Sequence, residues 1–200
     1  MRRIILIIAA LVVAPTLYGQ NIPQYRNDAV ELSAEYKQGN AFQQDLLLYA
    51  DMLSSTHPYY ADAKHRKGLE RRVRKVYKEC GKIEDVADFK LTLARLAASL
   101  GDGHTAISYW SNLERIFPVR LSLDINQPAK VDVTSEEHRA LLGKEVKAVN
   151  GRPLAKILRS AREIVSADND VNFLNLVKEY LMFAEFWSFL DMSDECLTLT

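Results

Sequence analysis

The sequence predicts an α+β protein in which helices come first, short strands follow and helices return. Apolar residues recur at helical spacing between residues 42 and 100 and again after residue 154. Between these two parts, apolar and polar residues alternate along short segments, as in strands with one buried face. The predicted divisions are a signal peptide over 1–19, an N-terminal helical domain over 20–104, a small β segment over 105–153 and a helical segment over 154–200.

The first 19 residues have the pattern of a secretory signal peptide. Arg2 and Arg3 give a basic start, and an uninterrupted apolar stretch of 11 residues runs from Ile4 to Ala14. That stretch is too short to span a membrane, which takes about 20 residues. The sequence therefore predicts cleavage after Gly19 and export to the periplasm, the cell envelope or the extracellular space, with no permanent membrane span after cleavage.

Three helices are predicted in the first half of the mature chain. The first contains Phe42–Leu53 and ends before Pro58, because the residue that precedes a proline avoids the helical region. The second runs from about Ala61 to Cys80, and the third from about Val86 to Leu100. Short polar turns join them, so we expect a small helical bundle.

The second helix carries a basic cluster, and the expected role of that cluster is a solvated face. The formal net charge of the whole chain is zero, so no global charge favours a nucleic-acid partner, and none is expected. The cluster consists of Lys64, His65, Arg66, Lys67, Arg71, Arg72, Arg74, Lys75 and Lys78.

In the middle of the chain, the alternation of apolar and polar residues predicts strands. The segments are Thr105–Trp110, Pro118–Leu123, Lys130–Thr134 and Lys144–Val149, and the Asn150-Gly151 pair that follows the last is a tight-turn signal.

Helices return over Leu154–Val165 and Val171–Leu190, and the strand-like Leu197–Thr200 has no evident partner in the sequence. Aromatic residues of the last helix are expected to pack against a core. They are Phe183, Phe186, Trp187 and Phe189.

The two cysteines, Cys80 and Cys196, have no informative spacing. In an oxidising compartment they could form a disulfide, and each could equally be a small buried apolar residue. Neither lies in a metal-ligand pattern, and the histidines show no such pattern either. The sequence therefore predicts neither a metal nor a cofactor.

Several segments together resemble a known family. They are Leu53–Tyr59, the helix before Gly101, the Asp102-Gly103-His104-Thr105 run, Phe117-Pro118 and Leu142–Leu154. In this order they resemble the N-terminal region of the tail-specific, or C-terminal-processing, serine peptidases, in the exported tricorn-like branch. The resemblance extends from Phe42 to the end of the chain.

The resemblance implies peptide-bond hydrolysis of an extended peptide or protein substrate by the complete family member. It also implies that the nucleophilic serine belongs to a following domain, and no serine here stands in a recognisable nucleophile context. We therefore expect the chain to be inactive alone, as a truncated product, a fragment or a member without its catalytic domain. Residues 143–151 resemble the strand and turn of a PDZ domain, where peptides add a strand to a sheet edge.

His104 is the candidate catalytic residue. By resemblance it is the general base that takes the proton of the serine, with Asp102, Gly103 and Thr105 supporting the motif. The alternative is a structural turn in which Asp102 caps backbone donors. The alternative function for the chain is a periplasmic peptide-binding or scaffold module without catalysis.

Overall fold

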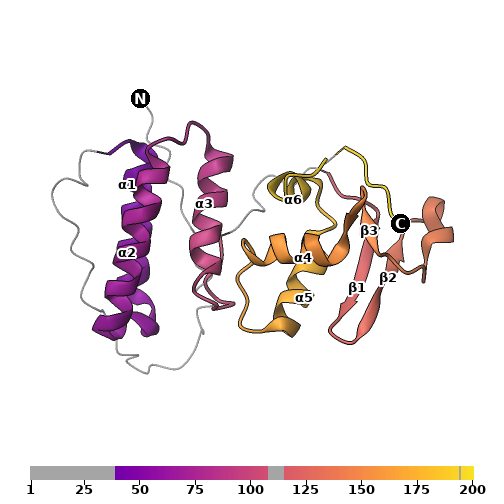
Figure 1. The fold of residues 1–200 in the computed structure, drawn as a ribbon, viewed down its shortest axis with the longest axis horizontal. Helices are drawn as coiled ribbons and strands as arrows, with labels where there is room; N and C mark the ends of the chain where they lie inside the picture. Colours follow the sequence, from indigo (N-terminus) through magenta and orange to yellow (C-terminus); the bar gives the residue numbers. More distant parts are fainter. Residues whose placement is uncertain (1–38, 108–114, 194) are drawn as a thin grey trace, which may run out of the picture. The chain divides into compact units, whose positions relative to one another are not determined.

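A computed structural model describes residues 39–107, 115–193 and 195–200 of the chain. The predicted signal peptide lies outside these residues. The chain divides into two compact units, Met1–Phe89 and Lys90–Thr200, and the division falls inside the third helix (Figure 1). The fold is mixed helix and antiparallel sheet, which confirms the α+β class. The domain limits at residues 104 and 153 stay predictions.

The first unit is helical. It contains α1 (Ala41–Thr56), the short 3₁₀ helix η2 (Pro58–Ala61), α2 (Ala63–Cys80) and the start of α3 (Val86–Ala98). Its core is made by residues of α1, η2 and α2 with no more than 1% exposure, namely Leu46, Ala50, Tyr60, Leu69, Val73 and Cys80.

Local side-chain contacts set the limits of α1 and α2. Asn40 begins α1 through a capping box, because its side chain accepts from the Gln43 amide while the Gln43 side chain accepts from the Asn40 amide. His57 ends α1 before Pro58, as the sequence predicted. The predicted start of α2 at Ala61 is slightly early, since the Asp62 side chain accepts from the Lys64 amide and begins the helix at Ala63.

The second unit is built on an antiparallel hairpin of β1 (Val119–Asp124) and β2 (Gln127–Thr134). Helix α5 (Asp170–Tyr180) packs against β1. A segment around residue 145 adds to the far edge of β2, where the Val131 amide donates to the Lys144 carbonyl at 3.0 Å and the Val146 amide to the Ala129 carbonyl at 2.8 Å.

The predicted tight turn forms between β3 (Ala148–Val149) and β4 (Arg152–Pro153). Both turn residues have positive φ, 49° at Asn150 and 74° at Gly151, which is the conformation that a two-residue hairpin of this type requires. The 3₁₀ helix η4 (Glu136–Leu141) precedes this hairpin.

Two predicted strands are shorter or absent. Of Lys144–Val149, only Ala148 and Val149 are a strand, although Glu145 forms a single bridge with Lys130. Thr105–Ile107 is a turn followed by irregular backbone, because the amide and hydroxyl of Thr105 both donate to Asp102. The rest of that predicted strand, residues 108–110, lies outside the described residues.

The prediction of a single helix over Val171–Leu190 is wrong. The structure contains α5 and a separate α6 (Ala184–Phe189), after α4 (Leu154–Arg162). The backbone between α5 and α6 pairs with a distant segment instead of continuing the helix. The Phe117 amide donates to the Met182 carbonyl at 2.7 Å, and the Ala184 amide donates to the Arg115 carbonyl at 3.1 Å.

Of the four aromatic residues predicted to pack against a core, Phe186 and Trp187 are buried, whereas Phe183 and Phe189 are half-buried. Phe186 is 1% exposed and Trp187 is 2% exposed, and the indole N–H of Trp187 donates to the Leu181 carbonyl at 2.8 Å. The expectation that Leu197–Thr200 lacks a partner is wrong, because the Thr200 amide donates to the Ala148 carbonyl and the Asn150 amide to the Thr198 carbonyl.

Both cysteines are free thiols, with Cys80 buried and Cys196 exposed. Within the ranges that the structure describes, no helix combines the length and apolar character needed to cross a membrane.

Candidate functional site

The candidate site lies on the loop that follows α3. Gly101, with φ of 67°, takes the left-handed conformation that commonly ends a helix and turns the chain into Asp102-Gly103-His104-Thr105. All four residues of this run belong to the second unit. The run that the sequence singled out around His104 is therefore a loop that follows α3.

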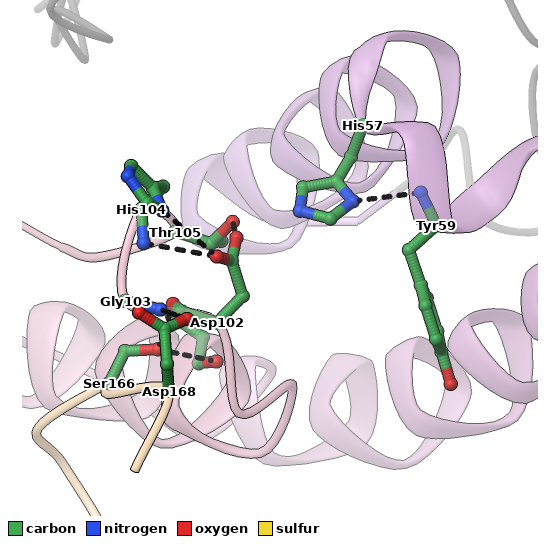
Figure 2. A network of polar contacts seen from close by, with 9 residues as sticks. His57, Tyr59, Asp102, Gly103, His104, Thr105, Ser166 and Asp168 are labelled. Atoms are coloured by element: carbon green, nitrogen blue, oxygen red, sulfur yellow. Dashed lines mark hydrogen bonds and ion pairs between the residues drawn. The ribbon is translucent and has the colours of Figure 1, made fainter.

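The carboxylate of Asp102 organises the loop (Figure 2). One oxygen accepts from the His104 amide at 3.1 Å, and the other accepts from the Thr105 hydroxyl at 2.5 Å. The Asp102 carbonyl also accepts from the Thr105 amide at 3.1 Å. These contacts form an Asx-type turn, in which a short acidic side chain satisfies backbone donors further along the chain. The structure thus contains the turn that the sequence offered as the alternative, in which Asp102 caps backbone donors.

The same carboxylate lies beside the imidazole of His104. The Nδ1 atom is 3.4 Å from Asp102 Oδ1, and 92% of the His104 side chain is exposed. This distance is long for a hydrogen bond, and catalytic contacts in free active sites are often long and shorten when substrate binds. Asp102 therefore lies within ion-pair distance of the imidazole.

Among the described residues, Nε2 of His104 has no hydrogen-bond or ion-pair partner. An imidazole with one nitrogen against a carboxylate and the other exposed can accept a proton at the exposed nitrogen and return it. Of the four histidines of the chain, His104 is exposed, whereas the other three are half-buried. His57 differs, since its Nδ1 accepts from the Tyr59 amide at the start of η2.

Two further residues come from the connection between α4 and α5. The Ser166 hydroxyl donates to the Asp102 carbonyl at 2.7 Å, and the Gly103 amide donates to the Asp168 carboxylate at 2.8 Å. Ser166 is 4% exposed, so its hydroxyl is held inside the unit. Sequence analysis gave this connection no role and placed it only between two predicted helices, because its contacts join residues 64 and 65 positions apart.

Asp168 explains why position 103 is a glycine. A Cβ atom at Gly103 would lie 2.7 Å from Asp168 Oδ2, closer than real Cβ contacts, and 3.2 Å from its Cγ, which is tighter than most. Any larger residue would displace the Asp168 carboxylate from the Gly103 amide. The glycine therefore allows the close approach of Asp168, and its φ is not in the left-handed region.

The loop also brings together three side chains of the kinds that bind metal ions. Ligand atoms of Asp102, His104 and Asp168 all lie within 4.8 Å of one another. Two carboxylates and an imidazole could together hold a divalent cation. The sequence predicted no metal from spacing, and spacing could not have revealed this group because Asp168 comes from a distant segment.

Several serine hydroxyls are engaged with backbone carbonyls. Ser54 donates to the Asp51 carbonyl and Ser55 to the Met52 carbonyl, each at 3.1 Å within α1. With Ser166, these are the buried serines of the described part of the chain. A hydroxyl held inside a helix is poorly placed to attack a substrate. The absence of a nucleophile from the chain stays a prediction, since Ser33, Ser108 and Ser111 lie outside the described residues.

Comparison with known proteins finds no matching family model, no matching curated protein and no matching solved structure.

Proposed function

We propose that this chain supplies the acid–base pair, His104 with Asp102, of an exported serine-peptidase-like protein. In this proposal the nucleophilic serine is carried by a further polypeptide segment, and the chain alone is inactive. The observation that carries the proposal is the imidazole of His104, which is exposed and lies with Nδ1 3.4 Å from the Asp102 carboxylate. The resemblance of the surrounding segments to tail-specific peptidases supports the same assignment.

The proposed reaction assigns one role to each residue. His104 Nε2 takes the proton of the serine hydroxyl as the serine attacks the peptide carbonyl, and then returns it to the leaving amine. Asp102 holds the proton on Nδ1 and stabilises the imidazolium that forms. Ser166 and Asp168 are positioning residues, because they hold the backbone of Asp102 and Gly103 and do not contact the imidazole through these bonds.

The depression beside the β1–β2 hairpin favours a second function, peptide binding without catalysis. Its volume is about 260 Å³, and its lining includes apolar side chains of both the hairpin and the following helices, among them Leu123, Pro128, Val146, Leu154, Leu158 and Leu174. An extended peptide could place apolar side chains there. This is the function that remains if the catalytic proposal fails.

The proposal predicts no reaction of the chain alone with a fluorophosphonate, which labels activated serines. The purified 200-residue chain should stay unlabelled and should not cleave unstructured peptides, because Ser54, Ser55 and Ser166 donate to backbone carbonyls and no serine of the sequence stands in a recognisable nucleophile context. Expression together with the sequence encoded after Thr200 should give labelling that one serine of that added sequence accounts for.

Two results would contradict the proposal. One is labelling of the 200-residue chain that a single serine-to-alanine change within it abolishes. The other is an extended protein that neither reacts with the fluorophosphonate nor cleaves peptides.

A further inference from the structure

Helix α2 carries a row of basic residues on its exposed side. At 3.6 residues per turn, the row occupies an arc of about 100°, and every residue of α2 inside that arc is Lys or Arg. We call these residues the basic row. They are Lys64, Lys67, Arg71, Arg74, Lys75 and Lys78, and all are exposed.

Burial fixes the direction in which the basic row faces. Leu69, Val73 and Cys80 lie on the opposite side of α2 and have no exposed surface. This opposite side packs in the first unit, where α2 lies against α1 (Figure 1). The basic row therefore cannot turn inward without unpacking the helix.

Acidic residues compensate little of this charge. The two acidic residues of α2, Glu70 and Glu79, flank the arc, and Glu70 pairs with Arg74. No other member of the basic row has a carboxylate within ion-pair distance among the residues that the structure describes.

An ordinary solvated helix face mixes both signs of charge, whereas the 100° arc of the basic row contains only positive charges. Neighbours in the row are three or four residues apart, and like charges at these spacings destabilise a helix. An anionic surface would relieve that repulsion. The basic row thus has the charge, the exposure and the orientation of a binding surface for a polyanion.

The shape and chemistry of the row favour a membrane surface over a nucleic acid. It is straight and about 21 Å long, at 1.5 Å per residue, and it contains only Lys and Arg. Single-stranded nucleic acids are bound by basic side chains together with aromatic stacking groups. No aromatic residue stands in the arc. The predicted export signal also brings the chain to a membrane.

We propose that α2 binds the surface of an anionic phospholipid bilayer through the basic row, with the helix lying parallel to the membrane. Since the apolar side of α2 is buried in the first unit, binding is electrostatic and involves no insertion of this helix. Each basic residue near such a surface strengthens binding roughly fivefold, and salt screens the attraction. This surface is separate from the His104 loop, which belongs to the second unit.

Vesicle co-sedimentation of the full chain tests this proposal. The readout is the ratio of binding to phosphatidylglycerol-containing vesicles over pure phosphatidylcholine vesicles, because any contribution of the apolar Ile4–Ala14 stretch is common to both. The row variant is Lys67→Gln, Arg71→Gln and Lys75→Gln combined. Gln has nearly the helix propensity of Lys and Arg, and circular dichroism checks that the helix is retained.

The control variant removes the same number of charges elsewhere. Lys130→Gln, Lys144→Gln and Lys156→Gln change exposed residues of the second unit. We expect the binding ratio of the row variant to fall roughly 100-fold, and that of the control to change less than about twofold. Raising the salt to about 0.5 M should remove the preference of the unaltered chain for anionic vesicles.

Three results would overturn the proposal. The first is an equal loss in the row variant and the control, which would indicate a response to net charge alone. The second is an unaltered chain that binds both kinds of vesicle equally. The third is a duplex DNA or RNA that displaces the chain from anionic vesicles at equal phosphate concentration, which would make nucleic acid the preferred partner.

Discussion

Replacing Trp187 with alanine is expected to destabilise the second unit by about 3–5 kcal/mol, the usual cost of removing a large buried aromatic side chain. The side chain is 2% exposed, and its indole N–H donates to the Leu181 carbonyl at 2.8 Å inside the unit. The substitution would leave both a cavity and a carbonyl without its donor. Local relaxation would recover only part of this loss.

Hydrogen exchange of the α5 and α6 amides measures this change within the second unit. Val171→Ala is the matched control, because Val171 is an apolar residue at the start of α5 with 57% exposure. Its expected effect is within about 0.5 kcal/mol, as for other surface substitutions. A Trp187→Ala variant as stable as this control would show that α6 is not part of the core of the unit.

Replacing His104 with glutamine is expected to lower kcat by roughly 10²–10⁴-fold in the extended, serine-containing protein, the usual contribution of a positioned general base. KM should change much less, because a base acts on the transition state rather than on substrate binding. The imidazole is 92% exposed, so its loss should hardly affect folding. A steady-state assay with an unstructured peptide separates the two parameters.

His138→Gln is the matched control for that assay. His138 lies on η4 in the same unit and takes no part in the His104 loop. It should leave both kinetic parameters unchanged. Equal activity of the His104 and His138 variants would remove His104 from the catalytic mechanism.

Features that depend on neighbouring residues could be predicted from the sequence. Asn150-Gly151 predicted its turn because both residues tolerate positive φ, and the end of α1 followed from an apolar pattern that stops before Pro58. For the Asp102-Gly103-His104-Thr105 run, a turn capped by Asp102 was the alternative prediction, and the structure contains that turn. In each case the residues that determine the local backbone conformation lie within a few positions of it.

Features that depend on contacts between distant segments could not be predicted from the sequence. The break between α5 and α6 results from backbone pairing with Arg115 and Phe117, and helical periodicity contains no information about it. Ser166 and Asp168 reach the candidate site from another connection, so neither residue could be assigned a role in advance. The sequence could predict the loop of His104 but not the contacts that hold it.

The central claim is that Asp102 orients His104 so that Nε2 is available to accept a proton. Nitrogen-15 NMR of the imidazole in the 200-residue chain, at a pH where the ring is neutral, measures which nitrogen carries the proton. We predict that His104 holds its proton mainly on Nδ1, that Asp102→Asn reduces this preference and that Asp168→Asn leaves it intact. A proton mainly on Nε2, or a tautomer balance that Asp102→Asn does not alter, would contradict the account.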